Sequence, residues 1–448
     1  MSGVHVNLEQ LRKYNQPGPR YTSYPPATHF TDHPEMAVGA AGPLSLYFHL
    51  PFCSTQCLYC GCTNIVTNDL SRGANYLGYL EKELALRAAF VPVGSEVIQV
   101  QLGGGTPTFF QPAEIERIGQ LIRDTFPLAE VVEAGVEIDP RSLTKDKLAA
   151  LRTAGFNRAS LGVQDTCPEV QQTIARVQPL EMIAEKTAWL RDGGMESINF
   201  DLIYGLPNQT VESFNRTLDE VLTFAPDRFA IYSYAHIPWI KSFQKSYELL
   251  LPDAEMKMRL LQLTIQRLTD AGYVYIGMDH FAKPDDAMAK ALANGTLQRN
   301  FQGYSTLKGV DLHGFGMSAI SHAAGRYHQN HKELADYHAD LDAGVLPIAR
   351  GYAMTEEDQI RYHAIMRIMC DLYVDYAAVS DEIGVDFSDY FKTDIASLDD
   401  LEVDGLLIRE PTGLRVTPLG RLFVRIIAMR FDAYLQADQR KGRYSQTV

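Results

Sequence analysis

A regular alternation of short β-rich runs and amphipathic helical stretches is the feature that most constrains this fold. The expected strands are 44–50, 97–102, 135–138, 158–163, 197–203, 228–234 and 273–277. Repeated β–α units make strands parallel, with the helices as crossovers between them. The pattern predicts an α/β fold, either a doubly wound sheet or a partial (β/α) barrel, and periodicity alone does not choose between the two.

The helical stretches carry their own spacing and boundary residues. Apolar side chains recur at helical spacing at Leu77, Leu80, Leu84 and Ala88, and again at Val211, Phe214, Leu218 and Leu222. Thr210 is an expected N-cap for the second of these helices. Another helix is expected to begin after Asp253 and to end at Gly272.

Two segments of different character flank the alternation. The N-terminal segment 17–25 (PGPRYTSYP) contains too much proline for a helix or a central strand. From about residue 355 the pattern becomes helical, with a hairpin expected over 406–418 and then an apolar helix, an order typical of a winged-helix-like module. We therefore expect an N-terminal arm (1–37), a core (38–285) and a mainly helical C-terminal domain (286–448).

Composition and charge narrow the class of protein. No stretch approaches the ~20 apolar residues that a membrane span needs, and the N-terminus has no apolar core of a secretory signal. A cytoplasmic protein with reduced thiols is therefore expected. The 448-residue chain has a formal net charge of −14, which argues against nucleic-acid binding because phosphates require a basic face.

Four of the six cysteines fall within ten residues, at Cys53, Cys57, Cys60 and Cys62. The spacing Cys53-x3-Cys57-x2-Cys60 suits three corners of a [4Fe–4S] cluster, because soft thiolate ligands select iron–sulfur clusters or zinc. Cys62 is too close to Cys60 to reach a separate corner, so an accessory role is expected for it. The alternative is a structural zinc site with all four cysteines, although such sites usually use two separated pairs.

Each of the first six expected strands is followed by a distinctive motif. These are the cysteine cluster, GGGTP, EIDP, GVQD, DLIYGLP and YAH, and functional residues gather at the carboxyl ends of parallel strands. The cysteine spacing after the first strand resembles the radical S-adenosylmethionine (SAM) superfamily. The strings RYTSYP, HLPFC, YCGC, GGGTPT, GVQD, NFDLIYGLP, YAHIP, GMDHFAKPDD, RNFQGY and GMSAIS resemble the oxygen-independent coproporphyrinogen III dehydrogenase family over residues 14 to 325.

The resemblance implies a partial (β/α)6 TIM-like radical SAM barrel with a [4Fe–4S] cluster on Cys53, Cys57 and Cys60, whose fourth iron binds SAM. It places Tyr47, Gly104, Gly105, Thr106, Glu137 and Ile320 at this SAM, and Tyr59, Gln164, Arg176, Asp201, Ala235 and Gln302 at a second SAM. The residues alone leave plainer alternatives open. Tyr47 and Ile320 suit a core, Glu137 an exposed strand end, and Arg176 a helix surface.

The reaction implied by the resemblance is oxidative decarboxylation of two propionates of coproporphyrinogen III to vinyl groups, giving protoporphyrinogen IX in haem biosynthesis. A 5′-deoxyadenosyl radical would begin each step. Four substrate carboxylates need cationic or hydrogen-bonding partners, and Arg20 and Tyr21 are the candidates, although a loop ordered by proline explains them equally well. His49, four residues before Cys53, suits either a hydrogen-bonded core or support of the cluster loop.

The expected partners are the substrate and a flavodoxin-like electron donor, with no nucleic acid, no membrane and a monomeric chain. A haem chaperone that binds haem without oxidase activity is the main alternative. Such relatives have an aromatic residue where Cys62 stands and lack the RYTSYP arm, both of which are present here. A haem-degrading radical SAM methyltransferase and a zinc-stabilised binding protein are further alternatives.

Overall fold

The computed structural model describes residues 8–437 and 444, which form two compact units. Residues 30–252 and 309–353 form one of them, here called the sheet unit. The described parts of 1–29, 253–308 and 354–448 form the other, the helical unit. This division corrects the expected ranges, because 1–37 is no separate arm and neither 38–285 nor 286–448 is one unit.

The sheet unit is built on parallel strands that follow one another along the chain. They are β1 (Pro43–Leu50), β4 (Glu96–Gly104), β5 (Leu128–Ile138), β6 (Arg158–Gln164), β7 (Ser197–Tyr204) and β8 (Arg228–Ser233), and each pairs in parallel with the next. A doubly wound sheet reverses its strand order at a switch point. The sequential order therefore matches barrel-type winding.

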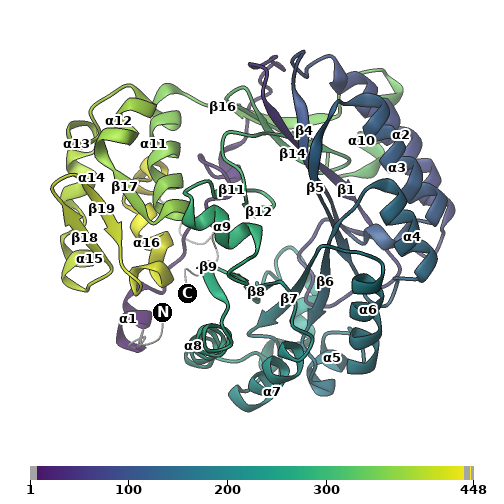
Figure 1. Ribbon diagram of the computed structural model, residues 1–448, viewed down its shortest axis with the longest axis horizontal. Helices are drawn as coiled ribbons and strands as arrows, with labels where there is room; N and C mark the ends of the chain where they lie inside the picture. Colours follow the sequence, from purple (N-terminus) through teal and green to yellow (C-terminus); the bar gives the residue numbers. More distant parts are fainter. Residues whose placement is uncertain (1–7, 438–443, 445–448) are drawn as a thin grey trace. The chain divides into compact units, whose positions relative to one another are not determined.

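Helices cross between these strands and cover the sheet. They are α2 (Ser71–Ala88), α3 (Pro112–Thr125), α4 (Lys145–Ala154), α5 (Pro168–Thr173), α6 (Leu180–Asp192) and α7 (Val211–Leu222), with 3-10 turns η2 (Pro107–Phe109) and η3 (Ser242–Leu250). Figure 1 shows α2, α3, α4 and α6 in a row along one side of the strands. The expected helices are confirmed, and the Thr210 hydroxyl caps α7 by accepting the Ser213 N–H.

The second segment of the sheet unit extends the sheet beyond β1. Its elements are β13 (Asp311–Phe315), β14 (Ile320–Ala323), β15 (Arg326–Asn330), α10 (Leu334–Asp342) and β16 (Ile348–Ala353), and the strand order of the unit is β16-β15-β14-β13-β1-β4-β5-β6-β7-β8. β13 is parallel to β1, with Leu46 opposite His313. The pairing joins strands far apart in the sequence, so local periodicity could not reveal it.

A buried ion pair fixes α2 to these returning strands. Arg87 and Glu83 are both 0% exposed, and Arg87 Nε donates to Glu83 Oε1 at 3.0 Å. Arg87 also donates to Ser321 and Asn330, while Glu83 accepts the Gly316 N–H at 2.7 Å. The network satisfies both charges inside the unit, as buried charges require.

The helical unit contains α1 (Leu8–Tyr14), η1 (Ala27–His29), α8 (Ala254–Asp270), β9 (Val274–Gly277), β10 (His280–Ala282), α9 (Ala287–Ala293), β11 (Gln298–Asn300) and β12 (Gly303–Ser305). The expected helix after Asp253 is confirmed as α8, with Asp253 as its N-cap. β9 pairs with β10 in an antiparallel hairpin. The expected strand 273–277 therefore does not continue the parallel β–α series.

The C-terminal part of the helical unit is mainly α-helical. It comprises α11 (Glu356–Met366), η4 (Arg367–Asp371), β17 (Tyr373–Asp375), α12 (Tyr376–Ile383), α13 (Phe387–Tyr390), α14 (Lys392–Ala396), α15 (Asp399–Val403), β18 (Leu407–Glu410), β19 (Gly413–Val416), η5 (Gly420–Phe423), α16 (Val424–Met429) and α17 (Ala433–Ala437). β17, β19 and β18 form a small antiparallel sheet. The expected hairpin is confirmed, whereas the expected apolar helix begins as the 3-10 turn η5.

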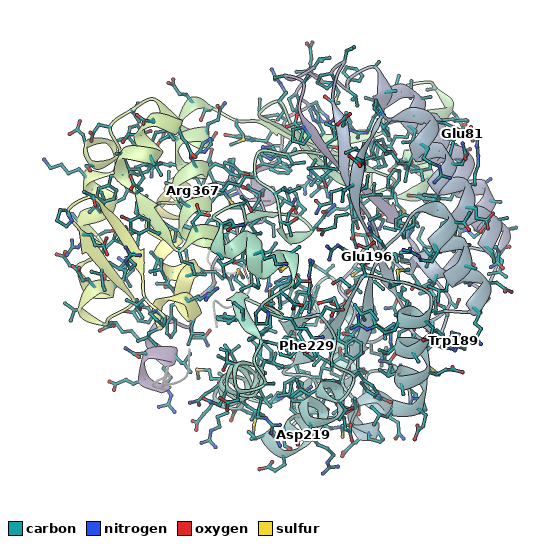
Figure 2. The ribbon with its side chains drawn as sticks, viewed as in Figure 1. Glu81, Trp189, Glu196, Asp219, Phe229 and Arg367 are labelled. Carbon is teal, nitrogen blue, oxygen red and sulfur yellow. The ribbon has the colours of Figure 1, made fainter. Side chains whose placement is uncertain are left out.

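Side chains of the sheet unit differ in burial between the helical layer and the interior. Figure 2 shows Glu81 and Trp189 on the helical layer and Phe229 inside the unit, where its exposure is 0%. Among the described residues no helix has the length and apolarity needed to cross a membrane.

Candidate active site

A cavity of about 750 Å³ lies at the carboxyl ends of the parallel strands of the sheet unit. Most of the candidate residues line it: Cys53, Cys57, Tyr59, Cys60, Cys62, Gly104, Gly105, Thr106, Glu137, Gln164, Arg176, Asp201 and Ala235. They come from β4 and the turn after it, from β5, β6 and β7, from the segment after β8, from the loop after β1 and, for Arg176, from the segment after α5. Parallel strands deliver their carboxyl ends to one edge, which explains why motifs spread along the sequence meet here.

The cysteine loop follows β1 and is held at both ends. Its beginning, β2 (Phe52–Cys53), pairs with β3 (Ile65–Val66). Its middle is held by two hydrogen bonds at Leu58. Tyr247 Oη donates to the Leu58 carbonyl at 2.6 Å, and Leu58 N donates to the Ile174 carbonyl at 2.9 Å. The loop is therefore positioned by backbone contacts of its own, independent of any ligand.

Each cysteine thiol has a different polar neighbour. Cys53 Sγ lies 3.3 Å from Thr106 Oγ1, and burial raises the pKa of its thiol. Cys60 Sγ accepts the Cys62 N–H at 3.4 Å. A hydrogen bond from the Cys62 thiol is the main reason that the pKa of Cys60 falls to about 6, and the same bond raises the pKa of Cys62.

Two guanidinium groups face the third thiol, Cys57, which is 7% exposed. Arg141 Nη2 and Arg176 Nη1 each donate to Cys57 Sγ at 3.4 Å. Both also bind Asp139 Oδ2, at 2.7 and 2.8 Å. Although burial opposes ionisation of Asp139, the two arginines hold its pKa below the ordinary value. Two positively charged side chains therefore lie against one thiol of the loop, that of Cys57.

Asp139 and Arg141 are site residues that the sequence analysis missed. Both lie in EIDPRS, directly after β5, and only Glu137 of this motif was selected. Their position at a strand end was the available clue. The side chain of Arg176 is 7% exposed, so Arg176 is not the surface arginine that the sequence alone also allowed.

The glycine turn after β4 is closely packed against its neighbours. A Cβ at Gly105 would lie 2.4 Å from the Pro51 carbonyl oxygen, and one at Gly104 would lie 2.7 Å from the His49 ring. The backbone N–H groups of Gly104, Gly105 and Thr106 donate to Glu137 Oε2, Leu50 O and Phe52 O. All three amides are therefore engaged by acceptors of the protein itself. The Thr106 hydroxyl and the carbonyl oxygens remain as contacts that the turn can offer.

Two carboxyl groups, those of Glu137 and Asp201, line the cavity and interact electrostatically. Burial, reinforced by the nearby Asp201, raises the pKa of Glu137 to about 7. Burial also raises the pKa of Asp201 to about 6, although Ser160 Oγ and Asn199 Nδ2 donate to its oxygens at 2.7 and 2.8 Å. Glu137 is therefore no freely solvated strand-end carboxylate, and its surroundings favour the protonated form.

His49 connects β1 to the far end of the cysteine loop. Its Nε2 lies 2.8 Å from the Thr63 carbonyl oxygen and its Nδ1 lies 3.2 Å from Tyr47 Oη. Burial lowers the pKa of His49 to about 4, so the neutral ring can donate to Thr63 and accept from Tyr47. Tyr47 and Ile320 are not among the described residues that line the cavity.

Three other candidates belong to the helical unit. Gln302 lies in the turn between β11 and β12, where its Nε2 is buried with no hydrogen-bond partner among the described residues. Arg20 forms an ion pair with Asp279. Tyr21 is 1% exposed, and its hydroxyl donates to Asp432 Oδ2 at 2.9 Å. Packing thus accounts for Tyr21, as the proline-ordered alternative expects.

The thiols of the cysteine loop fit a cluster ligand set chemically. Cys53, Cys57 and Cys60 open to one cavity, and the adjacent arginines offset the negative charge that deprotonated thiolates carry. Within residues 8–437 and 444, no three His, Cys, Asp or Glu side chains gather closely enough for a single metal ion. Three thiols that open to one cavity beside two guanidinium groups would suit a thiolate-bound cluster.

Comparison with known proteins gives two family matches. Residues 47–221 match the radical SAM superfamily, and residues 354–423 match the HemN C-terminal domain. The oxygen-independent coproporphyrinogen III oxidases of Helicobacter pylori and Escherichia coli are each 43% identical, over 99% of this chain and 99% of theirs. The protein from Synechocystis with the same name is 42% identical over 99% of this chain and 98% of its own.

A solved structure agrees with these matches. The E. coli structure described as "Coproporphyrinogen III oxidase (HemN)", "a Radical SAM enzyme", superimposes with a TM-score of 0.91 at 42% identity, covering 96% of this chain and 99% of that one. The similarity spans the sheet unit, the helical unit and the cysteine loop between β1 and α2. The chain therefore belongs to the oxygen-independent coproporphyrinogen III oxidase family of radical SAM enzymes.

Proposed function

We propose that this protein decarboxylates two propionate side chains of coproporphyrinogen III to vinyl groups without oxygen, giving protoporphyrinogen IX for haem synthesis. The observation that carries the proposal is the cavity in which Cys53, Cys57 and Cys60 meet the strand-end motifs. The chain that forms this cavity is 43% identical to an oxygen-independent coproporphyrinogen III oxidase. The protein's own task is to hold the cofactors and one substrate C–H bond in a shielded space.

Cys53, Cys57 and Cys60 would ligate the cluster, and Cys62 would stay outside the ligand set. When bound, the cluster and SAM supply the 5′-deoxyadenosyl radical that removes hydrogen from a propionate β-carbon. The Thr106 hydroxyl and the carbonyl oxygens of Gly104 and Gly105 are suited to receive the ammonium group of SAM. Glu137 is suited to accept hydrogen bonds from its ribose or amino group.

A second set of lining residues is suited to a second SAM. Its members, all in the lining of the same cavity, are Tyr59, Gln164, Arg176, Asp201 and Ala235. Arg176 offers a buried positive charge for a carboxylate, and Asp201 offers a carboxylate for an ammonium or hydroxyl group. Three further candidates do not belong to the described lining of the cavity. We assign Tyr47 and Ile320 to the first SAM and Gln302 to the second.

Outside the cofactor cavity the proposal includes one substrate contact and the expected partners. The Arg20 side chain is 33% exposed beside Asp279 and remains our candidate for a substrate carboxylate. Tyr21 would act indirectly, by fixing the backbone next to Arg20. A flavodoxin-like donor would reduce the cluster of a monomeric, cytoplasmic protein that binds neither nucleic acid nor membranes.

The decisive experiment is an anaerobic assay of the reconstituted protein with SAM, dithionite and coproporphyrinogen III. We expect protoporphyrinogen and two CO₂ per substrate. Stoichiometric haem binding without product would instead support the haem chaperone, and a colourless zinc protein would refute the cluster.

The ligand assignment is tested separately by cysteine variants. Cys53→Ala, Cys57→Ala and Cys60→Ala are each expected to abolish the brown chromophore and its electron paramagnetic resonance (EPR) signal. Cys62→Ala is expected to retain both, as is the control Cys167→Ala, whose thiol lies outside the cavity lining. Loss of the cluster in Cys62→Ala would refute the three-ligand set.

A further inference from the structure

A second cleft, of about 910 Å³, lies against the cysteine loop of the sheet unit. Residues 61–65 of the loop form one wall, and the start of α2, residues 237–241 and the start of α10 form the others. Gly61, Cys62 and Asn64 line both this cleft and the cofactor cavity. The two spaces therefore share part of the cysteine loop as their lining.

The charged lining of this cleft is mainly positive. Arg72, Lys241 and Lys332 line it, against the single carboxylate of Glu333. Lys241 Nζ donates to the Cys62 carbonyl at 2.7 Å, which ties a cation directly to the loop. Arg72 and Lys332 form no ion pair with the described residues. In a chain of net charge −14 such a local excess stands out.

Glu333 is the one carboxylate in the described lining of the cleft. α10 also carries Asp336, Asp340 and Asp342, but none of the three lines the cleft. Asp340 Oδ2 lies 3.0 Å from His331 Nε2, and Asp342 Oδ1 binds Lys82 Nζ at 2.6 Å. The last contact also joins α10 to α2, which Figure 1 shows beside each other.

An exposed apolar segment adjoins the basic lining. Ile240 lines the cleft and is 67% exposed, and the preceding Trp239 is 71% exposed. Tryptophan is enriched among the residues that dominate protein–protein binding energy. A cationic cleft with an exposed tryptophan at its edge is suited to an acidic protein surface.

We propose that this cleft is the docking surface for an acidic electron-donor protein with a one-electron flavin or iron–sulfur centre. The inference rests on the proposed function, because only a cluster on the neighbouring cysteines needs such a donor. One electron leaves the reduced donor and reaches the cluster, and no covalent bond forms or breaks.

The shared lining favours an electron donor over a substrate as the occupant. A substrate carbon must come into contact with the cofactor that attacks it, and Cys53, Cys57 and Cys60 line the cofactor cavity but not this cleft. An electron does not need that contact. The positive charges then serve to attract and orient the donor.

The test measures cluster reduction by two reductants. Reduced flavodoxin serves as the acidic protein probe and dithionite as the small-molecule control, with bleaching of the cluster followed by anaerobic stopped flow. Charge reversal in Lys332→Glu and in Arg72→Glu is expected to slow reduction by flavodoxin at least tenfold at low salt. The difference from the wild type should shrink as salt rises. Cluster content and reduction by dithionite should stay unchanged.

Arg216→Glu is the matched control, since it makes the same charge change on the exposed surface of α7, away from α2 and α10 in Figure 1. Equal slowing in this control, or unchanged flavodoxin reduction in both cleft variants, would overturn the proposal. So would a raised KM for coproporphyrinogen with dithionite as reductant, which would make the cleft a substrate site. Arg72 also lies over the ring of Phe52, which directly precedes Cys53. If Arg72→Glu loses its cluster for that reason, the result with Lys332→Glu decides the test. If the wild type forms no product with dithionite, the proposed function fails instead.

Discussion

Glu137→Gln is expected to stabilise the cofactor-free protein in a pH-dependent way. The carboxyl group of Glu137 has a pKa of about 7 in the folded chain, against an ordinary value of 4.5. Below pH 4.5 the group is protonated in both the folded and the unfolded chain and contributes no difference. As pH rises towards 7 the unfolded chain releases its proton first, so the free energy of unfolding falls.

The size of this effect follows from the shift. A difference of roughly 2.5 pKa units at 1.36 kcal/mol each gives about 3 kcal/mol above pH 7 and under about 1 kcal/mol at pH 5. Glu137 borders the cavity and its solvent, so about 3 kcal/mol is an upper bound. Glutamine has no charge to bury and keeps an oxygen for the Gly104 N–H, which now donates to Glu137 at 3.2 Å.

The assay is urea unfolding of the metal-free protein at pH 5 and at pH 8. Both tryptophans of the chain, Trp189 and Trp239, belong to the sheet unit, so their fluorescence reports on the unit that contains Glu137. The variant should gain stability at pH 8 and little at pH 5. Glu212→Gln, on the exposed surface of α7, removes the same charge outside the cavity and should show no such trend. An equal gain at both pH values, or a larger gain at pH 5, would refute the reasoning.

Three further changes have definite expected outcomes. Arg87→Ala should lower the free energy of unfolding by about 3–5 kcal/mol, because it leaves the Glu83 charge buried without its partner, and a loss below ~1 kcal/mol in urea unfolding would contradict this. Arg141→Gln removes a charged hydrogen bond to Cys57 and should make the cluster midpoint potential more negative; an EPR redox titration with no shift would show that the contact has no electronic effect. Thr210→Ala removes the N-cap of α7 and should cost about 1 kcal/mol, whereas Thr210→Ser should restore most of it.

The parallel strands and their helices were predictable because each is encoded locally. Apolar runs that end in a motif mark β1, β4 and β6, and the Thr210 cap marks the start of α7. The gathering of the site follows from the same information, since parallel strands share a carboxyl edge. Residue type and order were sufficient for this part of the molecule.

The unit boundaries and the finer contacts were not accessible in this way. The pairing of β13 with β1 depends on segments far apart in the chain. The N–H groups of Gly104, Gly105 and Thr106 donate to Glu137, Leu50 and Phe52, and only the packing of three separate segments determines these contacts. The two arginines on Cys57 likewise come from different loops, and neither loop alone indicates the contact.

The place of β13 beside β1 also has a consequence for biosynthesis. β1 is among the first elements to leave the ribosome, yet the strand that covers its outer edge follows the whole β–α series and residues 253–308. At ~5–20 residues per second, β1 spends on the order of tens of seconds with unpaired backbone groups along that edge. Exposed strand edges recruit other strands and promote aggregation. A chain that stops before residue 309 lacks β13 and keeps this edge of β1 open permanently.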